Sequence, residues 1–251
     1  MSPPRHVLIT GMSGLIGGLV GRSLSSRCTV RALNRSPVDG VDTVRADLND
    51  LEAIRPAFDG IDTVVHLAAY LGDDPSGHLS TNITGTYHVF EAARAAGVRR
   101  VVYASSGAAI TGYEADEPYR AMVEARWDDV PSDPPAVTTD HPVRPNGLYA
   151  ATKVFGEALA RHYADAYGLS MICLRIGRVR HGDKPQGPRE AAVYLSHRDA
   201  VQAVERCIDA PDDLRFAILF AVSANRGRYR DLEHARRTIG FVPQDGADWP
   251  L

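Results

Sequence analysis

The stretch VLITGMSGLIGG, residues 7–18, places three glycines three residues apart directly behind a short apolar run. The apolar run reads as a strand, and residues 15–24 read as a helix that begins within the glycine-rich turn. In such a turn Gly11 permits the tight bend, Gly14 lets a pyrophosphate approach the backbone, and Gly17 lets helix and strand pack closely. The helix N-terminus offers free N–H groups to the phosphates. The stretch therefore predicts a dinucleotide-binding turn, with a plain glycine-rich turn as the alternative.

The rest of the chain continues the alternation of short apolar runs with longer helix-period segments. The predicted strands cover residues 6–10, 28–33, 62–69, 99–106, 170–177 and 215–224. The predicted helices cover residues 15–24, 50–58, 82–97, 148–168 and 199–209. This alternation predicts an α/β fold, a Rossmann-type doubly wound parallel sheet. We expect residues 1–177 to form the dinucleotide-binding domain, with its sheet completed by residues 215–224, and residues 178–251 to form a small substrate-binding region.

Two irregular segments interrupt this rhythm. Residues 112–147 are rich in proline and acidic residues, and such a long loop is a lid, a partner surface or a disordered insertion. Residues 178–198 carry many Arg and His residues. Both segments follow the carboxyl ends of predicted strands, where open α/β sheets bind their ligands, so both are candidates for substrate contact.

Composition and charge exclude several classes of partner. The 251 residues carry a formal net charge of -3, which provides no basic surface for nucleic acid or an anionic membrane. Cys28, Cys173 and Cys207 show no metal-ligand or redox-pair spacing, which predicts no metal site and a reducing, cytoplasmic setting. The chain contains no apolar run long enough to cross a bilayer and no apolar signal core at its N-terminus. We therefore expect a small-molecule substrate as the partner.

The end of the second predicted strand should bind the adenosine ribose of the cofactor. An acidic residue there would favour NAD, but the chain has Asn34 followed by Arg35, which favours the 2′-phosphate of NADP. A solvated loop arginine is the alternative, so the cofactor is NAD or NADP. Asp47 and Leu48 suit the edge and face of an adenine ring, although Asp47 also fits a plain surface position. The predicted cofactor-binding residues are Gly11, Ser13, Gly14, Leu15, Ile16, Gly17, Asn34, Arg35, Asp47, Leu48, Leu67, Ala68, Ala69, Tyr149, Lys153 and Ile176.

The segment GLYAATK, residues 147–153, supplies a candidate catalytic pair. Tyr149 and Lys153 are four residues apart on a predicted helix, which places both side chains on one face. A neighbouring ammonium lowers the pKa of a phenol, so Tyr149 is predicted to take a proton from a substrate hydroxyl while hydride leaves for the nicotinamide ring. Ser105 and Ser106 end the fourth predicted strand, and Ser106 would hold the same substrate oxygen. Lys153 would also bind the nicotinamide ribose; an ordinary helix face is the alternative.

The glycine motif at residue 11, the serine pair that ends the fourth predicted strand and the Tyr149–Lys153 pair follow one another in this order. This ordered set resembles the extended short-chain dehydrogenase/reductase family, also called the NAD-dependent epimerase/dehydratase family. The blocks that carry the resemblance are TGMSGLIG, DTVVHLAA, NITGTYHVFEAARAAGV, VVYASS, YAATK and LRIG. The resemblance implies that Asn82 supports the active site, and an N-cap of the helix is the alternative role for Asn82. It also implies a homodimer that packs the helices at residues 85–97 and 148–167.

Within that family the C-terminal half is similar to the uronate dehydrogenases, through RPNGLYAATKVFGEALARHYADAYG, YLSHRDAVQAVERCI and VSANRGR. The similarity implies NAD-dependent oxidation of the anomeric carbon of a hexuronate to an aldarolactone. It also implies that Arg189 grips the sugar carboxylate, for which an Arg fork is suited; a solvated loop arginine is the alternative. The predicted substrate-binding residues are Ser105, Ser106, Gly107, Arg178 and Arg189.

The chain departs from the uronate dehydrogenase pattern in ways that predict a retuned pocket. Gly107 and Ala108 stand where those enzymes carry Asn and His, which removes two polar contacts with the substrate. Asn34 replaces the expected acidic residue, and Arg178 adds a cation. The insertion at residues 112–147 is also longer than expected.

Other interpretations remain open. His197 and Asp199 could form a polar pair close to the substrate. The interpretation that we favour is that the stretch from Ser196 to Asp199 caps the helix at residues 199–209. The chain is most consistent with an NAD(P)-dependent oxidoreductase acting on a sugar acid or a related hydroxyl or carbonyl compound. The alternatives are an epimerase or dehydratase of nucleotide-linked sugars, disfavoured by the short region after residue 177, and a non-catalytic dinucleotide sensor, disfavoured by the YxxxK pair.

Overall fold

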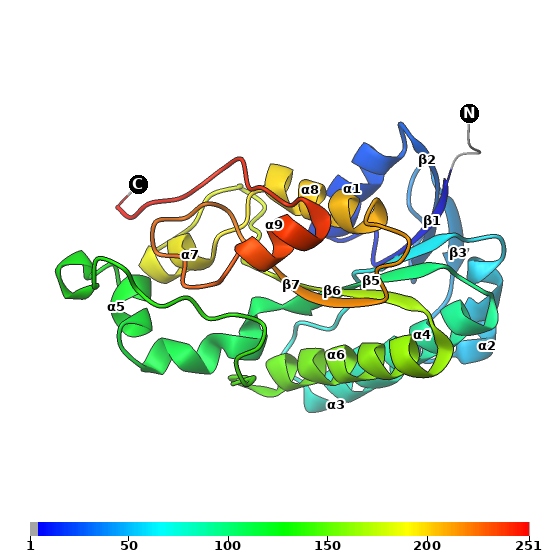
Figure 1. Cartoon of the computed structure of the whole chain (residues 1–251). Coiled ribbons are helices and arrows are strands. Elements are labelled where there is room, and N and C mark those ends of the chain that lie inside the picture. Colours follow the sequence, from blue (N-terminus) through cyan, green and yellow to red (C-terminus); the bar gives the residue numbers. More distant parts are fainter. Residues whose placement is uncertain (1–4, 251) are drawn as a thin grey trace.

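The central feature of the computed structural model, which describes residues 5–250, is one parallel sheet (Figure 1). Within these residues seven strands pair in the order β3-β2-β1-β4-β5-β6-β7, and every ladder is parallel. The strands are β1 (Arg5–Thr10), β2 (Cys28–Asn34), β3 (Asp42–Arg45), β4 (Thr63–His66), β5 (Arg100–Ser106), β6 (Ser170–Ile176) and β7 (Phe216–Ala221). The direction in which successive strands are added reverses between β1 and β4, which confirms the expected Rossmann-type, doubly wound sheet. In such sheets the ligand-binding crevice lies at this reversal, at the carboxyl ends of the strands.

Helices cover both faces of the sheet. Figure 1 shows α1, α8 and α9 on one face and α2, α4 and α6 on the other. The α-helices are α1 (Leu15–Leu24), α2 (Leu51–Ile54), α3 (Pro75–Gly77), α4 (Thr86–Ala95), α5 (Tyr119–Val123), α6 (Leu148–Tyr167), α7 (Pro188–Val193), α8 (His197–Ile208) and α9 (Glu233–Ile239). Short 3-10 segments form η1 (Arg55–Phe58), η3 (Gly107–Ala115) and η4 (Trp127–Asp129), and η2 (His78–Gly85) is a π-helix. Among the described helices none is long and apolar enough to span a membrane.

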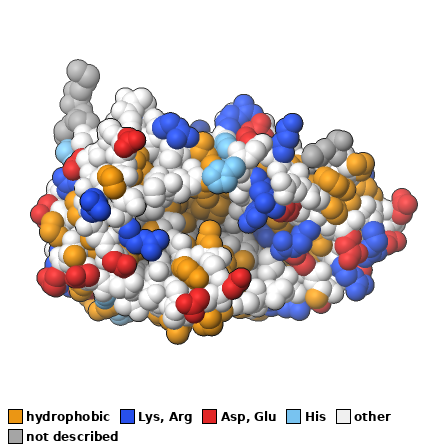
Figure 2. Space-filling view, turned by 180° about the vertical axis from the view of Figure 1, so that it is seen from behind, with side chains coloured by type: hydrophobic (Ala, Val, Ile, Leu, Met, Phe, Trp, Pro, Cys, Tyr) orange, Lys and Arg blue, Asp and Glu red, His pale blue; other side chains and the backbone are white. Residues whose placement is uncertain are grey.

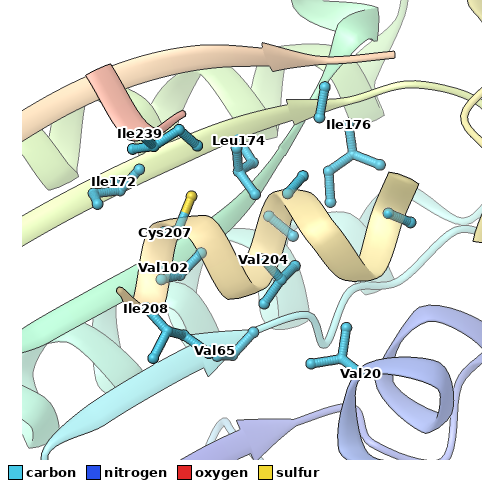
Figure 3. Close-up of a cluster of buried hydrophobic side chains, with 14 of the residues drawn as sticks. Val20, Val65, Val102, Ile172, Leu174, Ile176, Val204, Cys207, Ile208 and Ile239 are labelled. Carbon is cyan, nitrogen blue, oxygen red and sulfur yellow. The ribbon is translucent and has the colours of Figure 1, made fainter. Parts of the chain in front are cut away.

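Two apolar layers hold the helices to the sheet. Because side chains alternate along a strand, Val7 and Ile9 of β1 enter one layer and Leu8 enters the other. In the layer drawn in Figure 3, Val204 and Ile208 of α8 lie among apolar side chains of the central strands. Burial on both faces explains why the central strands read as continuous apolar runs.

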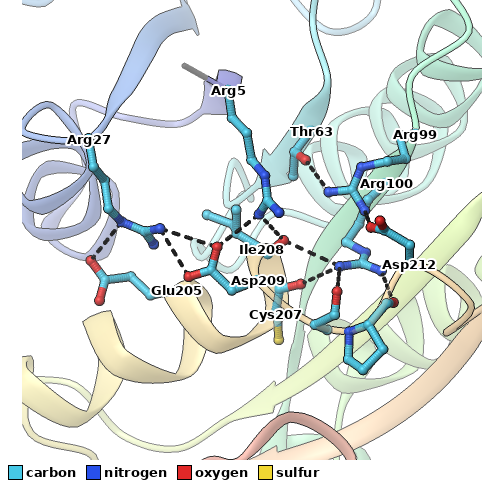
Figure 4. Close-up of polar contacts among 12 residues, drawn as sticks. Arg5, Arg27, Thr63, Arg99, Arg100, Glu205, Cys207, Ile208, Asp209 and Asp212 are labelled. Carbon is cyan, nitrogen blue, oxygen red and sulfur yellow. Dashed lines mark hydrogen bonds and ion pairs between the residues drawn. The ribbon is translucent and has the colours of Figure 1, made fainter. Parts of the chain in front are cut away.

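A buried arginine joins β5 to the C-terminal end of α8. Arg100 is fully buried, and its guanidinium donates hydrogen bonds to the carbonyl oxygens of Cys207, Ile208, Ala210 and Pro211 (Figure 4). Carbonyl groups at a helix end have no partner within the helix, so this side chain satisfies several of them at once. Burial lowers the pKa of Arg100 to about 10.

Two local elements differ from the sequence-based prediction. Strand β3 was not predicted; it is four residues long and lies at the sheet edge, and its pairing with β2 defines it. The helix predicted over residues 82–97 is divided into the π-helix η2 and the regular helix α4. A Cβ on Gly85, where η2 ends, would lie 2.9 Å from Leu48 Cβ, so the helix passes closely over the segment after β3 at this point.

The insertion at residues 112–147 is ordered, so the disordered alternative is wrong. It contains parts of η3 together with α5 and η4, and its side chains share an apolar cluster with Phe220. The backbone N–H of Val137 donates to the Tyr229 carbonyl over 2.7 Å, and Asp231 N–H donates to the Val137 carbonyl over 3.0 Å. The insertion is therefore fastened to the C-terminal part of the chain, next to the ligand-binding edge of the sheet.

Candidate active site

A cavity of about 780 Å³ opens at the carboxyl ends of the strands. Figure 2 shows a hollow in the middle of one face of the molecule, with an apolar interior and with Lys, Arg and His side chains gathered beside it. Every residue predicted to bind cofactor or substrate lies in the cavity wall, as do Ser106, Tyr149 and Lys153. The fold thus brings together residues from the first turn, the fourth predicted strand and the long helix α6.

The glycine turn forms a tight cradle at one end of the cavity. Gly11 has a φ of +71°, and a Cβ there would lie 2.7 Å from Ala68 Cα. A Cβ on Gly17 would lie 2.4 Å from the Gly11 carbonyl oxygen, so only glycine fits where α1 crosses the turn. Gly14 caps α1 without any side-chain hydrogen bond, which leaves the helix N-terminus open. The cradle fits the phosphates of a dinucleotide.

Asn34 and Arg35 lie beside this cradle, at the end of β2. The Asn34 side chain is buried, and its Oδ1 accepts a 2.9 Å hydrogen bond from Met12 N–H. Its Nδ2 is also buried and has no partner within residues 5–250. Arg35 is exposed and lines the cavity. This end of the cavity therefore presents an amide and a guanidinium where a carboxylate would select NAD.

Tyr149 and Lys153 lie in the same cavity but have a different electrostatic relationship from the predicted one. Lys153 Nζ donates a 2.8 Å hydrogen bond to the Ala104 carbonyl and lies 5.7 Å from the centre of the Tyr149 ring. Burial lowers the pKa of Lys153 to about 8. Burial also raises the pKa of Tyr149, and the Ser106 hydroxyl opposes that shift. The expected lowering of the phenol pKa by Lys153 is therefore wrong for the protein alone, because desolvation outweighs the more distant ammonium.

The two serines that end β5 have different surroundings. Ser105 Oγ donates a 2.5 Å hydrogen bond to Glu157 Oε1, and Arg175 binds both carboxylate oxygens of Glu157 over 2.8 Å. All three side chains are buried, so the predicted contact of the Ser105 hydroxyl with substrate is corrected: it is committed to this ion pair. Ser106 Oγ accepts from Ala108 N–H over 3.1 Å. Alternation along the strand separates the two hydroxyls.

Asn82 does not line the cavity, and it lies inside the π-helix η2 rather than at a helix N-cap, so the N-cap alternative is wrong. Its Oδ1 accepts from Tyr70 N–H over 2.7 Å, and its Nδ2 donates to the Tyr70 carbonyl over 3.0 Å. Nδ2 also lies 3.3 Å from Thr152 Oγ1. Asn82 thereby joins the loop after β4 to α6, at a residue that lies between Tyr149 and Lys153 in the sequence.

The far wall of the cavity is rich in arginine. Arg178 and Arg189 were predicted there, and the structure adds Arg180 and Arg230, which sequence reasoning missed. Arg180 pairs with Glu190, and Arg178 Nε lies 3.7 Å from the same carboxylate. No periodic pattern marks Arg230, and its contact with the Gly107 carbonyl joins positions 123 residues apart, so no signal in the sequence points to it.

His197 and Asp199 have structural roles, as we favoured. Ser196 Oγ accepts from Asp199 N–H over 3.0 Å and caps α8. Asp199 Oδ2 accepts from Ser223 Oγ over 2.6 Å, and Oδ1 accepts from Gln244 N–H over 2.7 Å. His197 Nε2 lies 2.7 Å from the Arg180 carbonyl oxygen.

A glycine cradle at the switch point of a parallel sheet, next to a buried Tyr–Lys pair, defines a dinucleotide-dependent enzyme. Residues 7–180 match the family model described as the NAD dependent epimerase/dehydratase family, and the chain belongs to that family. The match confirms the predicted family, and together with the similar dehydrogenases described next it confirms the enzyme class and the cofactor class, NAD or NADP.

Sugar dehydrogenases are among the similar proteins. The L-arabinose 1-dehydrogenase (NAD(P)(+)) of Haloferax volcanii is 34% identical, over 96% of this chain and 97% of that protein. The uronate dehydrogenase of Pseudomonas putida is 30% identical, over 98% of this chain and 87% of that protein. The crystal structure of uronate dehydrogenase from Agrobacterium tumefaciens superposes with a TM-score of 0.82 at 32% identity, over 97% of this chain and 85% of that one. The resemblance to uronate dehydrogenases is thus confirmed in sequence and in fold.

Proposed function

We propose that this protein is an NAD(P)-dependent dehydrogenase that oxidises a hydroxyl-bearing carbon, the anomeric carbon, of a cyclic sugar acid. The observation that carries the proposal is one cavity that joins the glycine cradle, the Ser106–Tyr149–Lys153 group and the arginine-rich wall. The similarity to uronate dehydrogenases and to an L-arabinose 1-dehydrogenase supports chemistry at that carbon.

In the proposed reaction Tyr149 is the general base and Ser106 orients the substrate. The Tyr149 phenolate removes the proton from the substrate hydroxyl, and the Ser106 hydroxyl donates a hydrogen bond to the same oxygen. The cofactor, when bound, would supply the acceptor for the hydride that leaves the carbon bearing this oxygen. The Lys153 ammonium, held by the Ala104 carbonyl, lies 5.7 Å from the centre of the Tyr149 ring, and its attraction for the phenolate opposes the burial that raises the pKa of Tyr149. Backbone N–H groups of the glycine cradle would hold the phosphates of the cofactor.

The arginine-rich wall supports a negatively charged substrate. Four arginines (Arg178, Arg180, Arg189 and Arg230) line it, and the acidic partners of Arg178, Arg180 and Arg189 are Glu114 and Glu190. A carboxylate substrate would complete this charge balance. The volume, about 780 Å³ including the cradle, suits one cofactor and a monosaccharide rather than a cofactor and a nucleotide-linked sugar. The epimerase alternative is disfavoured for this reason.

We also propose that the protein accepts NADP, on the basis of Arg35 and of the missing carboxylate at Asn34. Residues 178–251 supply all four arginines of the arginine-rich wall, which supports their assignment as the substrate-binding region. Exposed apolar side chains on α4 and α6, among them Tyr87 and Tyr167, support the homodimer that packs these helices. Light scattering coupled to size-exclusion chromatography tests that assembly. The cytoplasmic setting stays a prediction.

The direct test is turnover of purified protein with D-glucuronate, D-galacturonate, D-glucose and L-arabinose, each with NAD and with NADP. We expect reduced nicotinamide to form with a uronate, followed by its absorbance. Turnover of the neutral sugars alone would reject the sugar-acid substrate while keeping a dehydrogenase. Absence of turnover with all of these sugars would reject the proposed function.

A further inference from the structure

Arg230 is a buried cation with most of its hydrogen-bonding capacity unused. Its side chain is 3% exposed and lies in the cavity wall. Within residues 5–250 its acceptors are the Tyr229 hydroxyl, 3.0 Å from Nη2, and the Gly107 carbonyl, 3.4 Å from the same nitrogen. Nε and Nη1 are buried and have no partner among these residues. Burying a guanidinium without an opposite charge is costly, so such a group is expected to meet an anion.

The glycine at position 107 makes room for this guanidinium. A Cβ at that position would lie 3.0 Å from Arg230 Nη2 and 3.1 Å from its Nε. A larger side chain would therefore force the guanidinium to shift. Gly107 directly follows Ser106, so Arg230 lies next to the proposed reaction centre. The absence of a side chain at Gly107 and the position of the buried guanidinium are therefore one coupled feature of the pocket.

Arg189, the residue expected to grip a carboxylate, already has one. Its Nε donates to Glu114 Oε2 over 2.5 Å, and its Nη2 donates to Glu114 Oε1 over 3.3 Å. The Tyr229 hydroxyl also donates to Glu114 Oε1, over 2.6 Å. The Arg189 side chain is 54% exposed, whereas that of Glu114 is 11% exposed. The Arg189 fork is thus occupied, and Arg178 is exposed to solvent, so Arg230 is the buried guanidinium of this wall with unpartnered N–H groups among residues 5–250.

We propose that Arg230, seated against Gly107, recognises the anionic group of the substrate, a sugar carboxylate, in place of Arg189. The identity of the ligand as a sugar acid rests on the proposed function. The presence of a site that selects a negative charge does not depend on it. A planar guanidinium can donate two parallel hydrogen bonds to a carboxylate, which selects an acid over the neutral sugar of the same shape. Arg189 and Glu114 then form the outer rim that holds Tyr229 in place.

The test is direct binding, measured by calorimetry on the protein saturated with NADH so that no oxidation occurs. The probes are D-glucuronate, D-glucose and D-glucose 6-phosphate. We expect wild type to prefer D-glucuronate, and Arg230→Gln to weaken D-glucuronate binding by about 10- to 100-fold while D-glucose changes by less than about threefold. Arg189→Gln should cost D-glucuronate less than about fivefold. Arg228→Gln, an exposed arginine two positions away, is the matched control and should leave both affinities unchanged.

A second variant keeps the inference testable if Arg230→Gln unfolds. Gly107→Ala adds one methyl group against the guanidinium and leaves the charge in the protein, so it should reduce the preference for D-glucuronate with little change in the unfolding temperature. Equal affinity of wild type for D-glucuronate and D-glucose, including binding of neither, would overturn the inference. The inference would also be overturned if only Arg189→Gln weakened the binding of D-glucuronate. The same holds if Arg230→Gln changed the affinity for D-glucose 6-phosphate alone. Turnover is measured in a separate experiment. If the protein binds D-glucuronate more tightly than D-glucose but turns over neither, the proposed reaction is rejected and the anion site is retained.

Discussion

The Lys153 ammonium is fastened to the Ala104 carbonyl by a 2.8 Å hydrogen bond, which joins α6 to β5. The same nitrogen lies 5.7 Å from the centre of the Tyr149 ring, one helical turn away. The position of the charge is thus set by a strand, whereas the position of the phenol is set by the helix. This division gives the two residues separately testable roles.

Replacing Tyr149 by phenylalanine removes the proposed base and leaves the ring. We expect kcat/KM for oxidation to fall by about 100- to 10,000-fold, because a positioned acid–base group contributes that much. The unfolding temperature should be unchanged. Tyr167→Phe, on the exposed end of the same helix, is the control and should keep wild-type turnover. Retention of more than about a tenth of the activity in Tyr149→Phe would show that another group moves the proton.

Replacing Lys153 by methionine should change how stability depends on pH. Burial lowers the pKa of Lys153 from 10.5 to about 8, so between these values the unfolded chain binds more protons at this side chain than the folded protein does. Stability at this site therefore rises with pH through that window, by about 3 kcal/mol in total. We expect the unfolding free energy of wild type, relative to Lys153→Met, to increase accordingly in urea titrations from pH 8 to 10.5. The exposed Lys184→Met should give a constant difference.

The serine pair should separate activity from stability. Ser106→Ala removes the proposed hydrogen bond to the substrate oxygen and should lower kcat by about 100-fold with an unchanged unfolding temperature. Ser105→Ala leaves the buried Glu157 carboxylate short of one donor, so it should lower the unfolding free energy by about 1–3 kcal/mol with a smaller loss of turnover. Steady-state kinetics and urea unfolding on both variants check the pair. A greater loss of activity in Ser105→Ala than in Ser106→Ala would contradict these assignments.

Arg35 should set the preference for the phosphorylated cofactor. Arg35→Ala is expected to raise KM for NADP by about tenfold, because one charge-assisted hydrogen bond is lost, and to leave KM for NAD within about twofold. Arg45→Ala, an exposed arginine on the adjacent β3 that does not line the cavity, is the matched control. An unchanged ratio of the two KM values in Arg35→Ala would identify that side chain as a solvated surface charge.

Two neighbouring glycines of α1 should respond in opposite directions to alanine. A Cβ on Gly17 would lie 2.4 Å from the Gly11 carbonyl, whereas a Cβ on Gly18 would meet the flexible end of Arg22 at 3.4 Å. Gly17→Ala should lower the unfolding free energy by about 1–3 kcal/mol and weaken NADH binding. Gly18→Ala should raise it by about 0.5–1 kcal/mol, because alanine favours the helix. Equal effects of the two changes would argue against close packing at the cradle.

Much of the fold and of the candidate site was predictable because it depends on short-range patterns. The glycine spacing, the apolar runs and the four-residue spacing of Tyr149 and Lys153 each set a local geometry that needs no distant contact. The same holds for Ser196, whose cap of α8 is a contact across three residues. The parallel sheet followed from the repeated alternation of such segments, and with it the edge at which ligand-binding residues gather.

The features that sequence reasoning missed or misassigned all depend on partners far away in the chain. Strand β3 is a strand because it pairs with β2, and the Ser105 hydroxyl is buried because Glu157 and Arg175 lie behind it. The contact between Gly107 and Arg230 spans 123 residues, and no local pattern encodes it. Local sequence therefore determined the cradle, the sheet and the catalytic pair, whereas tertiary packing determined which hydroxyl and which guanidinium remain available to a substrate, because desolvation and pairing depend on what surrounds each group.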